Sequence, residues 1–102
     1  MKSAIFITVR TNSKRLPNKA LLEIQSIPTI THLIRRVKHV EVDHIILCTT
    51  LLKEDDILCD IATEEGIDYF RGSVQDKLER WQGAASKFEI DFFVTADGDD
   101  LF

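Results

Sequence analysis

At 102 residues and a formal net charge of −4, the chain is long enough for one domain or part of one, with a single modest core. Hydrophobic residues make up 44% and charged residues 29%, as in ordinary soluble proteins, and no apolar run approaches the roughly 20 residues of a membrane span. The mild acidity argues against nucleic acid as the main partner, and the first apolar run is too short for a signal peptide. We therefore expect a cytoplasmic protein with no nucleic-acid or membrane partner.

The first predicted element is a strand over residues 4–9, whose nearly continuous apolar character is typical of a parallel sheet covered on both faces. A basic segment, residues 9–19, follows directly and carries four cations, Arg10, Lys14, Arg15 and Lys19. No Asp or Glu occurs before Glu23. On an acidic chain, such a local excess of positive charge suits a small polyanion such as a nucleoside triphosphate.

After the basic segment the sequence predicts a short extended piece at residues 20–24, a turn at 25–26, and a helix that begins after Pro28 and ends near Glu41. The helix is indicated by apolar residues at helical spacing, namely Ile30, Leu33, Ile34, Val37 and Val40. A second strand follows over residues 44–48.

Three acids, Glu54, Asp55 and Asp56, predict the first turn of a second helix, because acids favour the positive end of the helix dipole. The predicted buried stripe of this helix is Ile57, Leu58, Ile61 and Ala62. Gly66 is placed as a left-handed residue after its last turn, and a third strand follows over residues 67–70.

The pattern Ser73-x-x-Asp76 predicts a capping box at the start of a third helix, which makes Asp76 a cap rather than a catalytic acid. The predicted apolar stripe of this helix is Val74, Leu78, Trp81, Ala85 and Phe88. A fourth strand is expected over residues 91–96, and three carboxylates lie within residues 97–100.

This alternation of strands and helices predicts a Rossmann-like α/β fold, a doubly wound parallel sheet in three α/β/α layers with strand order 3-2-1-4. In that order the segments after the first and fourth strands face each other, one basic and one acidic. Arginines would hold phosphate oxygens, while Asp97 or Asp99 would hold Mg²⁺. An equally favoured interpretation is that both segments are simply solvated.

The fourth strand is rich in Phe and Val, yet it would form a sheet edge, and such edges are usually protected. We therefore expect residues 1–102 to be the N-terminal portion of a longer domain. Cys48 and Cys59 are interpreted as reduced core thiols, and His32 and His39 have no neighbours suited to a metal site.

The basic segment resembles the signature loop of the cytidylyltransferases that make CMP-activated sugars, most of all the spore-coat-polysaccharide-type branch, which is similar to the acylneuraminate and 3-deoxy-octulosonate cytidylyltransferases. The resemblance is carried by the positions Arg10-x-x-Ser13-x-Arg15-Leu16-Pro17-x-Lys19. It continues through Phe70-Arg71-Gly72-Ser73 with Leu78-Glu79-Arg80, and through Ala96-Asp97-Gly98-Asp99. The resemblance covers the whole chain. It implies that residues 1–102 are the N-terminal nucleotide-binding portion of a nucleotide-diphospho-sugar transferase fold, which is truncated here.

The resemblance implies transfer of CMP from CTP to a sugar or sugar acid with release of pyrophosphate, for surface polysaccharide biosynthesis. It implies that Arg10 and Arg15 hold the triphosphate, that Lys19 supports the developing charge and that Ser13 offers a further donor. Mg²⁺ would be the cofactor, and the longer parent protein would be a homodimer.

The resemblance also gives roles to three residues outside the basic segment. Asp99 would bind the metal, Asp97 would lie at the nucleotide, and Arg71 would contact the base or ribose. For Arg71, a surface position at a strand end is an equally favoured interpretation.

Two other functions stay open at this stage. One is a non-catalytic remnant that binds a nucleotide or self-associates through the fourth strand. The other is a receiver-like signalling module, against which the basic first segment argues, since such modules place acids there.

Overall fold

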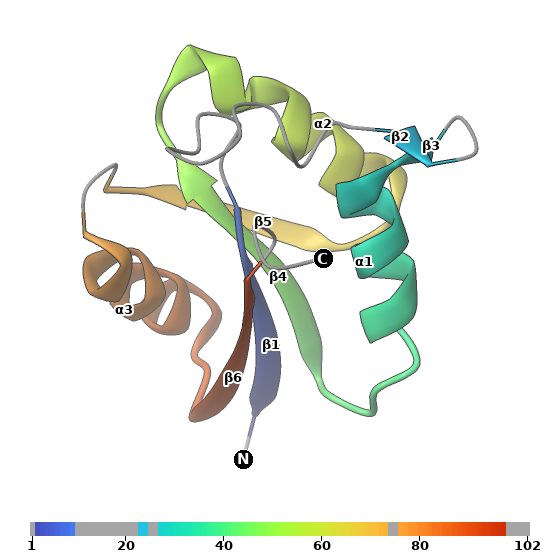
Figure 1. The fold of residues 1–102 in the computed structure, drawn as a ribbon. Helices are drawn as coiled ribbons and strands as arrows, with labels where there is room; N and C mark the ends of the chain where they lie inside the picture. The colour runs from blue at the N-terminus through green and yellow to red at the C-terminus, as the bar shows by residue number, and fades with distance from the viewer. Residues whose placement is uncertain (1, 10–22, 25–26, 74–75, 98–102) are drawn as a thin grey trace.

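The structure is a computed structural model and describes residues 2–9, 23–24, 27–73 and 76–97. Its elements, in chain order, are β1 (Ser3–Thr8), β2 (Glu23–Ile24), β3 (Ile27–Pro28), α1 (Thr29–Val37), β4 (His44–Thr50), the 3-10 helix η2 (Lys53–Asp55), α2 (Asp56–Glu64), β5 (Asp68–Gly72), α3 (Lys77–Phe88) and β6 (Phe92–Asp97) (Figure 1). None of the helices in these ranges is long and apolar enough to cross a membrane.

Four of the strands form one parallel sheet in the order β5-β4-β1-β6. This confirms the predicted order 3-2-1-4 and the predicted α/β class. Helices α1 and α2 cover one face of the sheet and α3 covers the other (Figure 1). The two-residue strands β2 and β3 pair antiparallel as a separate small hairpin, of which the sequence predicted only the first strand.

Alternation along β1 divides the core into two halves. Ile5, Ile7 and Val9 pack in the cluster formed with α1 and α2, whereas Ala4 and Phe6 pack in the cluster formed with α3. All five side chains are buried, as expected for a strand with a helical layer on each face. The near-continuous apolar character of residues 4–9 therefore reflects burial on both sides.

Helix α1 ends four residues earlier than the predicted boundary at Glu41. Beyond Val37 the backbone tightens, with the amide of His39 bonding the carbonyl of Arg36 and the amide of Val40 bonding that of Val37. These shorter-range bonds close the helix in a 3-10-like turn. Val40, the last of the apolar residues at helical spacing, therefore lies beyond the helix and is 51% exposed.

Helix α3 also differs from the sequence prediction. It begins after Asp76, whose carboxylate accepts a hydrogen bond from the amide of Glu79, so that Asp76 is the N-cap; Ser73 instead accepts a bond from the Asp76 amide. Leu78 was expected in the buried stripe but is 64% exposed. The buried residues of the helix are Arg80 and Ala84, with Trp81, Ala85 and Phe88 partly buried beside them. The predicted member Val74 lies outside the described residues.

Three further expectations are confirmed. Gly66 has a φ of +76° after the last turn of α2, in the left-handed region that favours glycine. Cys48 and Cys59 are both free and buried. Strand β6 is an edge of the described sheet, and its Phe92 and Val94 are 60% and 49% exposed.

Candidate functional site

The carboxyl ends of β1 and β6 lie side by side, with Thr8 opposite Asp97 in the strand register. Just beyond Thr8, the amide of Val9 donates to the carbonyl of Cys48 on the other neighbouring strand, at 3.2 Å. The chain winds outward from β1 in one direction through β4 and β5, and β6 lies on the other side. This is the switch point of a doubly wound sheet, the place where such sheets bind ligands beyond the carboxyl ends of their strands.

Most of the predicted site residues belong to the two segments that follow these strands in sequence. Arg10, Ser13, Arg15, Lys19 and Asp99 lie outside the residues that the structure describes. Asp97 is the last residue of β6, so the structure fixes its place at the carboxyl edge. The structure thus brings together the starting points of the basic and acidic segments, as the strand order predicted.

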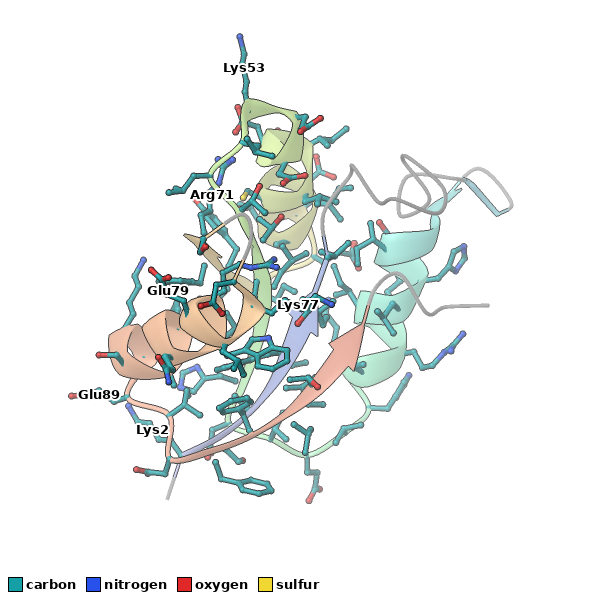
Figure 2. The ribbon with its side chains drawn as sticks, turned by 60° about the vertical axis from the view of Figure 1, so that its left-hand side comes forward. Lys2, Lys53, Arg71, Lys77, Glu79 and Glu89 are labelled. Atoms are coloured by element: carbon teal, nitrogen blue, oxygen red, sulfur yellow. The ribbon has the colours of Figure 1, made fainter. Side chains whose placement is uncertain are left out.

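Arg71 lies near the end of β5 (Figure 2). It donates three hydrogen bonds to residues 50–56, which run from the last residue of β4 to the first residue of α2. Its Nε donates to the carbonyl of Thr50 at 2.8 Å, and its Nη2 donates to the carbonyl of Leu52 at 2.7 Å. Its Nη1 donates to the carboxylate of Asp56 at 2.7 Å, which raises the pKa of the guanidinium. The expected contact with a base or ribose stays a prediction, but Arg71 already holds residues 50–56 in place.

Asp55 is a buried carboxylate that the sequence placed only in a helix first turn. It is fully buried and accepts a hydrogen bond from the hydroxyl of Thr50. The same hydroxyl accepts a bond from the amide of Leu52 at 3.2 Å. Together with Arg71, this network fixes the segment that leaves the carboxyl end of β4. The only signal of this network in the sequence is the dipeptide Thr49-Thr50 before an acidic turn.

The burial of Arg80 is the second feature that sequence reasoning missed. This residue is only 2% exposed. Its stem lies over the end of β5, where a Cβ on Gly72 would stand 2.8 Å from Arg80 Cγ. Its charge is felt by Cys48 on β4, where it lowers the thiol pKa, although burial is the larger influence and raises that pKa to about 12. The motif around Gly72 is therefore a packing unit that places a cation beneath the sheet's carboxyl end.

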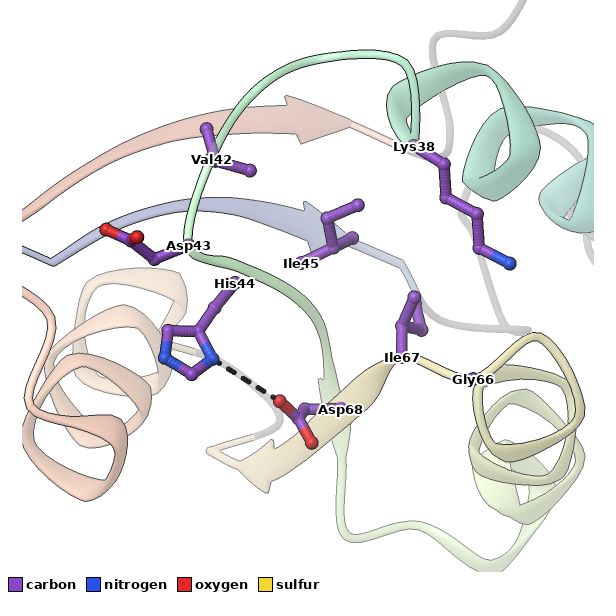
Figure 3. A pocket seen from close by; sticks show the side chains of 8 residues that line it. All are labelled: Lys38, Val42, Asp43, His44, Ile45, Gly66, Ile67 and Asp68. Carbon is purple, nitrogen blue, oxygen red and sulfur yellow. Dashed lines mark ion pairs between the residues drawn. The ribbon is translucent and has the colours of Figure 1, made fainter.

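Two hollows elsewhere on the molecule do not coincide with this edge. One, of about 250 Å³, lies at the amino ends of β4 and β5, where His44 and Asp68 are 3.6 Å apart (Figure 3). Its Lys38 ammonium donates to the backbone carbonyl of Glu65. The other, of about 440 Å³, borders β5 beside Tyr69. The exposed ion pair of Lys2 and Glu89, at 3.8 Å, likewise lies at the opposite end of the molecule from Arg71 (Figure 2).

Within the described ranges, no three or more His, Cys, Asp or Glu side chains are grouped so that they could hold a metal ion. Asp99, the predicted metal ligand, lies outside those ranges. Carboxylate oxygens such as those of Asp97 and Asp99 are hard ligands of the kind that Mg²⁺ prefers, so the donor chemistry of this segment fits that ion.

Comparison with known proteins gives a consistent picture. A family model described as cytidylyltransferase matches residues 4–102. An uncharacterised protein of Methanocaldococcus jannaschii is 37% identical over 101 residues, which is 98% of this chain and 42% of that protein.

Two solved structures share the fold. A cytidylyltransferase from Leptospira borgpetersenii superposes with a TM-score of 0.93 at 32% identity, over 99% of this chain and 43% of that one. A CMP:2-keto-3-deoxy-manno-octonic acid synthetase, solved in complex with CTP, superposes with a TM-score of 0.80 at 26% identity, over 99% of this chain and 42% of that one. The chain thus spans less than half the length of these relatives.

Proposed function

The chain belongs to the cytidylyltransferase family, and from that premise we propose that it is the nucleotide-binding portion of an enzyme that transfers CMP from CTP to a sugar or sugar acid. Pyrophosphate would be the second product. Because the relatives are more than twice as long, the acceptor site and the complete activity are assigned to the full-length protein. The likeness to a synthetase solved with CTP supports the choice of nucleotide.

One observation carries the proposal, namely the pairing of Thr8 with Asp97 at the carboxyl edge of the sheet. It brings together the two strand ends from which these segments continue in sequence, one with four cations and no acid, the other with three acids within residues 97–100. A nucleoside triphosphate needs both kinds of group, cations for its phosphates and carboxylates for the metal ion that accompanies it.

Within this site, Arg10 and Arg15 would hold phosphate oxygens through their guanidinium groups, and Ser13 would donate a further hydrogen bond. Lys19 would stabilise the charge that develops as pyrophosphate departs. Arg71 would face the base or ribose from the end of β5. These assignments rest on the family resemblance.

The proposed reaction is an in-line displacement at the α-phosphorus of CTP. A sugar hydroxyl oxygen forms the new bond to phosphorus and gives up its proton to solvent, while the bond from phosphorus to the bridging oxygen breaks and the pyrophosphate keeps the electron pair. Asp99 would hold Mg²⁺, which would supply charge neutralisation at the phosphates, and Asp97 would lie at the nucleotide. Catalysis by this chain's own residues is then mostly positioning and charge stabilisation.

We assign the full-length protein to the cytoplasm, to surface polysaccharide biosynthesis and to a homodimer. The two free, buried thiols support a reducing compartment. The biosynthetic role and the dimer rest on the family resemblance.

The test is calorimetric titration of magnesium-CTP into the protein, with magnesium-ATP for comparison. We expect CTP to bind and Arg15→Ala to lose most of the binding. Arg36→Ala is the matched control, because it removes the same charge from an exposed position in the last turn of α1. Binding of CTP that Arg15→Ala leaves unchanged would contradict the proposed site.

Turnover is tested separately in the full-length protein by pyrophosphate release from CTP with a panel of keto-sugar acids. CTP binding without turnover across the panel would favour the alternative of a non-catalytic nucleotide-binding remnant. Absence of CTP binding by the folded full-length protein would overturn the proposed function itself.

A further inference from the structure

Trp81 joins helix α3 to the last residue of β1. Its indole Nε1 donates a hydrogen bond to the hydroxyl of Thr8 at 2.8 Å, between residues 73 positions apart in sequence. Thr8 is 4% exposed, and Trp81 is partly buried. Arg10 follows Thr8 by two positions. The bond therefore anchors the strand at the point from which the basic segment continues.

The ring of Trp81 also contacts β6, the second strand of the candidate site. Its centroid lies 6.3 Å from that of Phe93, with the ring planes tilted by 54°. Phe93 in turn stacks on Phe6 of β1, with centroids 4.3 Å apart and planes within 16°. A column of three rings, Trp81, Phe93 and Phe6, thus ties α3 to both strands whose ends carry the proposed nucleotide residues.

Filling the core explains the ring of Trp81 but not its polar contact. A phenylalanine would bury a comparable apolar face against Phe93, but unlike the indole it has no N–H to donate a hydrogen bond to Thr8. Thr8, which accepts this hydrogen bond, is the residue of β1 that pairs with Asp97 of β6. The bond therefore restrains one member of the residue pair at the centre of the proposed site.

We propose that Trp81 is a positioning residue of the nucleotide site, which fixes Thr8 by its indole N–H and β6 by its ring and so holds together the strand ends from which the basic and acidic segments continue. This inference rests on the proposed function. It assigns Trp81 no contact with the nucleotide; the residue acts through Thr8 and Phe93.

The experiment compares Trp81→Phe, Thr8→Val and the double variant in the full-length protein. Each single variant loses one hydrogen bond, so we expect magnesium-CTP to bind about fivefold more weakly. The double variant should bind no more weakly than the weaker single variant, because both changes remove the same bond. Equal affinity in wild type and both single variants would overturn the inference.

Phe88→Leu separates positioning from general loss of stability. Phe88 packs in the same cluster as Trp81 but lies in the last turn of α3. We expect this variant to lose stability while it keeps the wild-type affinity for CTP. If Phe88→Leu weakens CTP binding as much as Trp81→Phe, Trp81 has only a structural role.

A second readout decides the inference without nucleotide. The amide of Val9, bonded to the carbonyl of Cys48, reports on the end of β1 and can be followed by hydrogen exchange. We expect its exchange to rise about fivefold in Trp81→Phe and Thr8→Val but not in Phe88→Leu. An unchanged exchange rate at Val9 in Trp81→Phe and Thr8→Val would overturn the inference. Failure of the wild-type protein to bind CTP would instead overturn the proposed function.

Discussion

Gly83 of α3 lies against the ring of Phe70 on β5, so close that a Cβ added to Gly83 would stand 2.6 Å from Phe70 Cζ. The same ring also lies against Gly72, where an added Cβ would stand 3.0 Å from Phe70 Cε2. The two glycines therefore make the space in which an aromatic ring fits between helix and sheet.

We expect Gly83→Ala to destabilise the protein. Helix propensity alone would favour alanine by about 1 kcal/mol. Overpacking of a filled core costs about 1–3 kcal/mol, and here it should dominate because the ring lies close to both glycines. Chemical denaturation measures the net change, and Ser86→Ala, at an exposed position of the same helix, is the control. A more stable Gly83→Ala variant would show that the ring can move aside.

Gly66→Ala is expected to destabilise the protein for a different reason. No atom lies within 4 Å of a Cβ placed at Gly66, so space is not the obstacle. The obstacle is the backbone conformation at φ +76°, because a left-handed conformation costs an L-residue about 1–2 kcal/mol. Thermal unfolding should rank the proteins as wild type, then Gly66→Asn, then Gly66→Ala, since asparagine tolerates this region better. Equal stability of the two variants would contradict the conformational explanation.

Arg71→Lys should open the segment after β4 although it keeps the charge. Lysine cannot reproduce the three-way geometry of the guanidinium, and a lost charged hydrogen bond costs about 1.5–3 kcal/mol. The amide of Asp55, which bonds the carbonyl of Leu52 at 3.0 Å, should then exchange faster. Asp56→Asn is the matched control. The side chain of Asp56 is 56% exposed, so the variant should lose less than about 1 kcal/mol of stability. If the Asp55 amide exchanges at the same rate in Arg71→Lys as in wild type, Arg71 does not hold this segment in place.

Glu65 should make stability depend on pH. The hydrogen bond from Arg35 to its carboxylate, at 2.9 Å, is the largest influence that holds the pKa of Glu65 below its ordinary value of 4.5. A lowered folded-state pKa contributes stability above pH 4.5, and that contribution disappears as the pH falls through the folded-state pKa.

Glu65→Gln should therefore be less stable than wild type at pH 7, by about 0.5–1 kcal/mol, and the difference should vanish towards pH 3. Urea denaturation at pH 7, 5 and 3 measures this trend. Glu64→Gln, at the exposed neighbouring position, is the control. A difference between wild type and Glu65→Gln that persists at pH 3 would mean that the ion pair is not its source.

The sequence by itself determined the strand order and the left-handed glycine. Continuous apolar runs, such as residues 4–9, predict strands buried on both faces, and their alternation with helices restricts the sheet to few arrangements. The closeness of the ends of β1 and β6 follows from that order alone, because the carboxyl ends of parallel strands share one edge. The chemistry of Arg10, Arg15, Lys19 and Asp99 remains a prediction from the sequence.

Only the tertiary structure decided which residues of α3 face the sheet. Helical spacing gives the relative phase of a stripe, but not how the helix turns once it meets its neighbours. Here the glycines at 72 and 83 admit the stem of Arg80 and the ring of Phe70, so the helix buries a cation and leaves Leu78 exposed. The bond from Trp81 to Thr8 depends on the same placement, because it joins residues far apart in sequence that only packing brings within 2.8 Å.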